Sequence, residues 1–327
     1  MDFQLSEEHL MIRQAARDFA QNQCLPGVIE RDDKQPFPRE QVSALADLGF
    51  LGMMVDPQYG GSGLDTISYV LAMEEISKVD ASTSVCMSVN NSLVCYGLES
   101  YGSEAQKQQY LTPLAQGKKD GELYIGAFLL SEPEAGSDAT SQRTTAEDMG
   151  DYYLLNGTKN WITNGSSASV YLVIAQTNVE AGHRGINAFI VERGMEGFER
   201  GRNLDKMGMH AQDTAELFFN NVKVPKENVL GDPTQGFVYL MNGLAEERLI
   251  SGAGAIASAR AAPHRRAHGR RRDDPSRTRS HPAQTELCHR PRPPALPPPL
   301  PPRARPARHL RAPPRVSGSH PAHGRTR

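Results

Sequence analysis

Residues 123–140, LYIGAFLLSEPEAGSDAT, mark the point at which the sequence pattern of this chain changes. An apolar, strand-like run ends in a turn that contains Pro133 and Gly136 together with small hydroxyl side chains, Ser131 and Ser137 among them. Glycine and serine allow backbone amides to approach phosphate or ring oxygens closely. The turn is therefore either an ordinary surface loop or the cradle of a ligand, and these residues alone leave both possibilities open.

Upstream of this turn the sequence predicts helices joined by short loops. Residues 6–24 begin with a potential capping residue, Ser6, and carry apolar side chains at a spacing of four. The glycine-rich stretch PQYGGSG, residues 57–63, lacks the Gly-Lys-Ser/Thr and G-x-G-x-x-G patterns of nucleotide-binding loops. We therefore expect an all-helical N-terminal domain over residues 1–120.

Downstream of the turn, strand-like runs follow one another without helical segments between them. The runs are LYIGAFLL, YYLL, TKNWI, SVYLVIAQT, INAFIVER and ELFFNNVKV. Asn156-Gly157, between the second and third runs, is typical of a two-residue hairpin. This density predicts an antiparallel β domain over 121–232. A helical period returns from Thr234 and predicts the first helix of a C-terminal bundle over 233–259, so the expected fold class is α+β with an incomplete bundle.

Residues 260–327 differ in composition from the rest of the chain. They contain 17 arginines, three acidic residues and 15 of the 23 prolines. Their formal net charge is +14 and that of residues 1–259 is about −16, which together give −2 for the whole chain. With so few apolar side chains, we expect a disordered tail. Two origins remain open: a shifted, GC-rich reading frame that replaces three bundle helices, or a genuine basic tail whose segment 290–303, RPRPPALPPPLPPR, binds as a polyproline helix or to phosphate backbones.

Features that would indicate export, a membrane anchor or a metal site are missing from the sequence pattern. The four cysteines show no paired spacing, which predicts free thiols in a reducing compartment. The start, MDFQLSEEH, has no apolar signal region, and no apolar run approaches the length of a membrane span. We therefore expect a cytoplasmic protein with no metal site that binds neither membranes nor nucleic acid.

KNWITNG, residues 159–165, contains the only tryptophan of the chain. A single tryptophan in a small sheet is commonly part of the core. Trp161 and Thr163 are two residues apart, however, so both side chains lie on one face of a regular strand. An indole beside a hydroxyl can bind a flat heteroaromatic ring by stacking and one hydrogen bond. The pattern is compatible with both roles.

Several of these motifs together resemble the acyl-CoA dehydrogenase family. The resemblance rests on AFLLSEPEAGSDA, NGTKNWITNG, GHRGINAFIVERG, the segment from KMG to DTAELFFNNVKVPKENVLG, PQYGGSG and YGSEAQKQQYLTPLAQG, in consistent order over residues 1 to about 258. It implies a helical domain, a β domain and a four-helix bundle, with FAD between them. It also implies oxidation of an acyl-CoA to a trans-2-enoyl-CoA in fatty-acid β-oxidation, electron transfer to electron-transfer flavoprotein and, for an intact member, a homotetramer.

The resemblance assigns the turn at residues 131–140 to the flavin. It implies that the Ser131 hydroxyl meets the isoalloxazine edge, that the amides of Gly136 and Ser137 face the pyrophosphate, and that Ser137 also contacts acyl-CoA. It places Trp161 beside the flavin and Thr163 near N5. The residues implied in FAD binding are Phe128, Leu129, Leu130, Ser131, Glu132, Pro133, Gly136, Ser137, Trp161, Ile162 and Thr163.

The implied reaction needs a carboxylate that takes the α-proton of the thioester while the β-hydrogen leaves as hydride. In many members of the family this base lies late in the bundle, in a segment that this sequence does not show. The isovaleryl and long-chain types instead carry it in an early Glu-Arg pair. LAEERLI, residues 244–250, contains such a pair, Glu247-Arg248.

Helical spacing favours Glu247 over its neighbour as the base. Glu247 shares a face with Leu240 and Leu244, whereas Glu246 points about 100° away. A carboxylate on an apolar stripe has a more perturbed pKa, although a merely solvated Glu247 remains the alternative. The residues expected to contact the acyl-CoA here are Ala245, Glu246, Glu247 and Arg248.

Two functions follow from these observations. The first is an FAD-dependent acyl-CoA dehydrogenase. The second is an inactive flavoenzyme remnant that acts as a binding protein through its basic, proline-rich tail.

Overall fold

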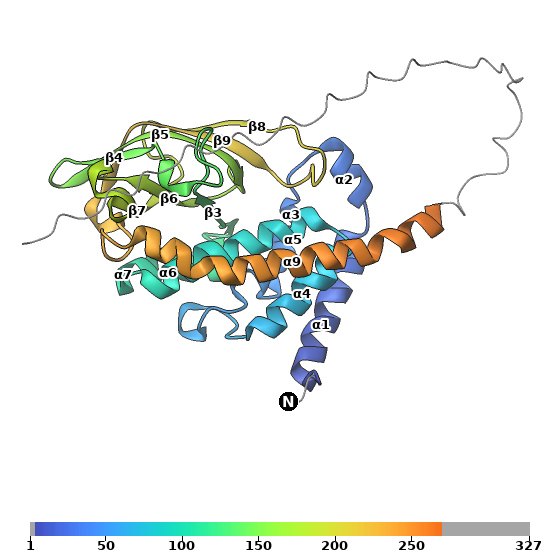
Figure 1. The fold of residues 1–327 in the computed structure, drawn as a ribbon. Helices are drawn as coiled ribbons and strands as arrows, with labels where there is room; N and C mark the ends of the chain where they lie inside the picture. Colours follow the sequence, from blue (N-terminus) through green and yellow to red (C-terminus); the bar gives the residue numbers. More distant parts are fainter. Residues whose placement is uncertain (1–3, 270–327) are drawn as a thin grey trace, which may run out of the picture. The chain divides into compact units, whose positions relative to one another are not determined.

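Helices make up the N-terminal part of the computed structural model, which describes residues 4–269 and the side chains of residues 4–262 (Figure 1). The helices are α1 (Glu7–Phe19), α2 (Val28–Lys34), α3 (Arg39–Asp47), α4 (Thr66–Ser77), α5 (Ala81–Ser88), α6 (Tyr96–Tyr101), α7 (Glu104–Gln106) and α8 (Thr112–Gln116). Ser6 caps α1 by accepting a hydrogen bond from the His9 amide at 3.1 Å. The predicted helical N-terminal region is confirmed.

A seven-stranded sheet follows the helices, with strand order β3-β6-β4-β5-β9-β8 and β7 paired to β6. Its strands are β3 (Gly126–Leu129), β4 (Thr145–Asp148), β5 (Tyr152–Thr163), β6 (Val170–Gln176), β7 (Ile186–Glu192), β8 (Phe198–Asn203) and β9 (Thr214–Pro225). β1 (Lys118–Lys119) and β2 (Glu122–Leu123) form a separate two-stranded sheet. Most pairs in the large sheet are antiparallel as predicted, but β3 and β4 each run parallel to β6.

The predicted hairpin at Asn156-Gly157 is wrong. Both residues lie inside β5, which pairs with β9 on either side of them. The pairing shifts register between Leu155 and Gly157, where one residue of β5 lies opposite two of β9, Asn220 and Asn221, so the extra residue forms a bulge in β9. Gly157 has a φ of +148°, and a Cβ at this position would collide with Thr144. A sequence typical of a turn thus lies within a long strand, opposite a bulge in β9.

Apolar and polar contacts together join the helical layer to the sheet. Leu98 and Leu111 from the helices share a buried cluster with Leu172 of β6. Asn90, also fully buried, donates from Nδ2 to the carbonyl oxygens of Leu51 (2.8 Å) and Leu114 (3.1 Å), while its Oδ1 accepts from the Gly126 amide at 2.9 Å. One amide side chain therefore links the short helical turn at Phe50–Gly52 and α8 to the start of β3.

Replacing Asn90 by alanine is expected to lower the free energy of unfolding by about 3 kcal/mol. The change removes the partner of the buried Gly126 amide and the Asn90 donor to Leu51 O, whereas Leu114 O keeps its hydrogen bond from the Gly117 amide. Each loss of a buried partner costs about 1–3 kcal/mol when not relieved by water. Urea unfolding of the two proteins measures the difference. The matched control is Gln108→Ala, which removes an exposed hydrogen bond to Glu104 and is expected to leave stability nearly unchanged. Equal stability of the Asn90 variant and the wild type would contradict this role.

α9 (Gly236–Gly269) contacts the helical layer at α4 and α6 and the sheet at β7 (Figure 1). Its backbone remains helical beyond the predicted end at residue 259, in keeping with the high helix propensity of alanine and arginine. The rest of the predicted disordered tail, residues 270–327, lies outside the described residues. The observed order of helical region, sheet and C-terminal helix agrees with the predicted fold class.

Candidate functional site

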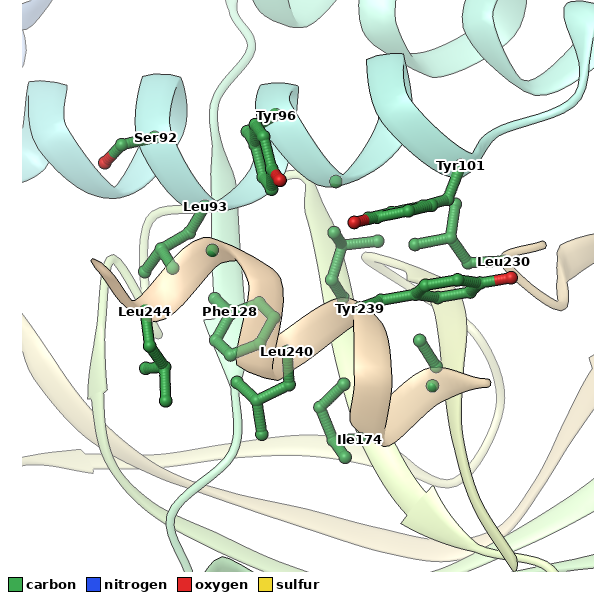
Figure 2. A pocket seen from close by; sticks show the side chains of 15 residues that line it. Ser92, Leu93, Tyr96, Tyr101, Phe128, Ile174, Leu230, Tyr239, Leu240 and Leu244 are labelled. Atoms are coloured by element: carbon green, nitrogen blue, oxygen red, sulfur yellow. The ribbon is translucent and has the colours of Figure 1, made fainter. Parts of the chain in front are cut away.

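An apolar cavity of about 40 Å³ lies where the helical layer, the sheet and α9 meet (Figure 2). A water molecule needs roughly 10–15 Å³ by this measure, so the cavity can hold only a few waters or a short chain of carbons. Its walls include Ser92, Leu93 and Tyr96 from the helical layer, Phe128, Leu172 and Ile174 from the sheet, and Tyr239, Leu240, Gly243 and Leu244 from α9. Sequence reasoning identified Phe128, Leu240 and Leu244 but missed the remaining walls.

Aromatic side chains hold the start of α9 against α6 along one side of this cavity. The rings of Tyr101 and Tyr239 stack with centroids 3.8 Å apart, as Figure 2 shows, and Tyr96 meets Tyr101 edge-on at 6.2 Å. The Tyr239 hydroxyl also accepts a hydrogen bond from the Asp232 amide at 2.9 Å. These contacts fix the position of the α9 residues that line the cavity.

Glu247 lies one helical turn after the cavity-lining Gly243. Its Oε1 is buried and has no hydrogen-bond partner among the described residues. Burial raises the pKa of this carboxyl above its ordinary value; the nearby Ser92 hydroxyl opposes the shift, and Glu246 adds to it. Because Ser92 also lines the cavity, the carboxylate lies near the Ser92 end of the apolar space. A half-buried carboxylate with one unpaired buried oxygen and a raised pKa has the properties of a general base.

The neighbours of Glu247 have different surroundings. Glu246 accepts a weak hydrogen bond from Thr66 Oγ1 at 3.4 Å, at the start of α4. Ala245 and Arg248 are exposed on α9. Of the four acyl-CoA contacts predicted on α9, therefore, only the Glu247 carboxylate has a buried, unpaired oxygen near a residue that lines the cavity.

The turn at residues 131–140 leaves backbone donors free. Glu132 and Ala135 close it by donating to each other's carbonyl oxygens at 3.1 and 3.2 Å. Gly136 and Ser137, which follow, are exposed, and within the described residues their amides donate to no acceptor. No atom lies within 4 Å of the position that a Cβ on Gly136 would take. Adjacent free amides with open space before them can bind an anion such as phosphate.

Three of the predicted cofactor-binding residues direct their side chains into the protein interior. Leu129 and Ile162 belong to the core of the sheet. Glu132 is buried and forms an ion pair with Lys159 at 2.8 Å. Only the backbone of these three residues is therefore placed to meet a ligand, whereas Ser131 is half-buried and Pro133 is exposed.

Trp161 is 60% exposed, so it is not part of the core of the described structure. It has a positive φ of +61°, and the pairing of β5 with β9 shifts register between Lys159 and Ile162. The strict alternation of a regular strand therefore does not apply across this stretch. Thr163 is half-buried two residues further on. An exposed indole close in the chain to a hydroxyl remains a suitable surface for a flat ring.

Two further classes of site were sought in the described part of the chain. No three His, Cys, Asp or Glu side chains of residues 4–262 come together in a group that could hold a metal ion. Among the described helices, none combines the length and the apolar character needed to cross a bilayer.

Two family models and a curated relative match this chain over most of its length. The family model "Acyl-CoA dehydrogenase, N-terminal domain" matches residues 6–118, and "Acyl-CoA dehydrogenase, middle domain" matches residues 127–222. The short-chain specific acyl-CoA dehydrogenase of Clostridium acetobutylicum is 41% identical over 268 residues, which cover 80% of this chain and 69% of that relative.

Solved structures show the same similarity. Butyryl-CoA dehydrogenase from Megasphaera elsdenii aligns with a TM-score of 0.77 and 42% identity, over 80% of this chain and 68% of its own. An acyl-CoA dehydrogenase from Bacillus anthracis, complexed with FAD, aligns with a TM-score of 0.72 and 33% identity, over 78% of this chain and 43% of its own. The chain spans 59% to 69% of the length of the curated relatives that it matches most strongly.

Proposed function

Because the chain belongs to the acyl-CoA dehydrogenase family of FAD-dependent oxidoreductases, we propose that it removes the α- and β-hydrogens of an acyl-CoA thioester to give a trans-2-enoyl-CoA. The observation that carries this proposal is the half-buried Glu247, whose Oε1 is buried without a hydrogen-bond partner among the described residues, near Ser92 of the apolar cavity. We also propose the domain limits 1–120, 121–232 and 233–259, and FAD binding at the sheet side of the cavity.

The described residues fit FAD. The free amides of Gly136 and Ser137 would face its pyrophosphate, and the exposed Trp161 would lie against its ring system. The Ser131 and Thr163 hydroxyls, both half-buried, would hydrogen-bond to the ring. When bound, FAD would accept the hydride that leaves the β-carbon of the substrate.

Glu247 performs the proton transfer in this proposal. Its carboxylate takes the α-proton, and the electrons of that C–H bond form the new carbon–carbon double bond as the β-hydrogen departs with its own electron pair. The apolar walls, including Leu240 and Leu244, exclude water from the reacting carbons. A dry site raises the basicity of the carboxylate and so favours transfer of a weakly acidic proton.

The size of the cavity favours a short acyl chain as substrate. A volume of about 40 Å³ leaves room for only a few carbon atoms between its walls. Electron-transfer flavoprotein as the electron acceptor, a homotetramer and a cytoplasmic location remain proposals that rest on sequence resemblance and composition. The alternative role, a binding protein acting through a basic tail, depends on residues outside the described structure, and no observation favours it.

Anaerobic mixing of the FAD-reconstituted protein with butyryl-, isovaleryl- and palmitoyl-CoA tests the proposed reaction. Loss of flavin absorbance with the short thioesters, and little or none with palmitoyl-CoA, is expected. FAD-loaded protein that keeps its absorbance with all three thioesters would contradict the proposed function.

Gly243→Leu is expected to lower kcat/KM for butyryl-CoA by about a hundredfold, because the added side chain and the acyl chain compete for one space. A Cβ at Gly243 would lie 3.4 Å from Tyr96, so the branch extends into the cavity without a forced collision at its base. The control is Gly252→Leu on the exposed side of α9, where no atom lies within 4 Å of the new Cβ. Equal losses in both variants would show that the cavity is not the acyl site.

A further inference from the structure

Lys159 is a fully buried lysine beneath the turn that carries Gly136 and Ser137. Its side chain is 0% exposed, and its ammonium donates to Leu130 O at 3.0 Å, to Glu132 Oε1 at 2.8 Å and to Gln142 Oε1 at 3.0 Å. All three donors of the ammonium group are therefore used. Such complete satisfaction is what a buried charge requires.

The partners of Lys159 lie at both ends of one loop, residues 130–144. Leu130 and Glu132 stand at its beginning and Gln142 near its end. The Glu132 carboxylate, 4% exposed, also accepts from the backbone amides of Arg143 (2.7 Å) and Thr144 (3.1 Å). The cluster of Lys159, Glu132 and Gln142 thus ties the two ends of the loop to each other and to β5.

The energetics indicate that this cluster specifies a conformation more than it adds stability. A buried ion pair recovers little beyond the cost of removing both charges from water, and an apolar pair of equal volume is commonly as stable. Burial lowers the pKa of Lys159 to about 8, and Glu132 offsets only part of that shift. Burial alone would raise the pKa of Glu132, but the charge and hydrogen bond of Lys159, together with hydrogen bonds from Thr144 and Arg143, lower it below the ordinary value.

We propose that Lys159 is a positioning residue, which holds the ends of the 130–144 loop so that the free amides of Gly136 and Ser137 present one fixed site to the pyrophosphate of FAD. The proposal rests on the proposed function for the identity of the ligand. Lys159 itself lies under the loop, so it acts through Leu130, Glu132 and Gln142 and touches no ligand.

Lys159→Met removes the ammonium and keeps the length of the side chain. In flavin-free protein, amide hydrogen exchange over residues 130–144 is expected to become faster, while β6 and β7 remain protected. The Kd for FAD, followed by flavin fluorescence, is expected to rise about tenfold or more, the effect of losing one hydrogen bond of ordinary net strength to the loop amides. Lys226→Met is the control, because it removes an exposed ion pair with Asp148 (2.9 Å) on the same sheet.

A double variant, Glu132→Gln with Lys159→Met, tests whether Lys159 positions the 130–144 loop or only stabilises the folded protein. It leaves no unpaired buried charge, so urea stability is expected to recover relative to Lys159→Met. Leu130 O and Gln142 Oε1 still lack their donor, however, so fast exchange of the loop and weak FAD binding are expected to persist. Recovery of loop protection and FAD affinity together with stability would overturn the proposal.

The loop measurement and the flavin measurement can fail separately. If wild-type protein binds no FAD, the proposed function is wrong, whereas exchange in the flavin-free protein still decides whether Lys159 orders the loop. Unchanged exchange over residues 130–144 in Lys159→Met would overturn the positioning role. Faster exchange with unchanged FAD affinity would overturn the link between this loop and the pyrophosphate.

Discussion

Glu247→Gln is expected to slow the reduction of bound FAD by butyryl-CoA about a thousandfold, the loss typical of removing a general base. Glutamine keeps the shape of the side chain but cannot accept the α-proton at neutral pH. The Glu247 carboxylate has a buried oxygen without a hydrogen-bond partner among the described residues, and this oxygen is free to accept the proton. Stopped-flow absorbance of the flavin under anaerobic conditions measures the rate.

Glu246→Gln is the matched control for this experiment. Its carboxylate meets Thr66 at 3.4 Å, on another side of α9, so a loss of threefold or less is expected. Binding of the product, an enoyl-CoA, is expected to be nearly unchanged in the Glu247 variant, since only basicity has been removed. If flavin reduction in the Glu247→Gln variant keeps nearly the wild-type rate, Glu247 is not the base. The alternative, a carboxylate later in the bundle, would then be favoured.

Local signals in the sequence predicted the helical layer and the position of Glu247. Ser103 and Gln106, spaced as Ser-x-x-Gln in the sequence, form a capping box at the start of α7, because capping depends on residues three apart. The stripe of Leu240, Leu244 and Glu247 likewise follows from helical spacing. Both leucines line the cavity, and Glu247 has a buried oxygen beside it.

Features that depend on distant partners could not be predicted in this way. Asn156-Gly157 is a turn signal by itself, but its pairing with β9, far along the chain, keeps it within a continuous strand. A lysine on a strand suggests a solvent-facing side chain, yet Lys159 is buried because Glu132 and Gln142, 27 and 17 residues earlier, supply its acceptors. Nor could the sequence place Ser92 and Tyr239 on one cavity, since that depends on how α9 packs on the helical layer.

The rate of flavin reduction is expected to rise with pH and to reach a plateau only above the raised pKa of Glu247. Burial favours the protonated carboxyl, so below that pKa each unit of pH changes the fraction of active carboxylate about tenfold. Stopped-flow rates across the pH range give the midpoint, which is expected above the value of about 4.3 for an exposed glutamate. A midpoint at or below that value would contradict the buried position of the base.

The same pKa shift has a consequence for stability, with a definite sign. The folded protein binds the Glu247 proton more tightly than the unfolded chain, so this contribution to stability is fully present below the unfolded pKa of about 4.3 and is lost as pH rises through the raised folded pKa. Glu247→Gln has no such loss. Urea unfolding of the flavin-free proteins should therefore show the variant gaining stability relative to wild type as pH rises from about 4 through the folded pKa. A stability difference that stays constant with pH would mean that the Glu247 carboxyl is equally solvated in the folded and unfolded states, which would remove the physical basis for its role as a perturbed base.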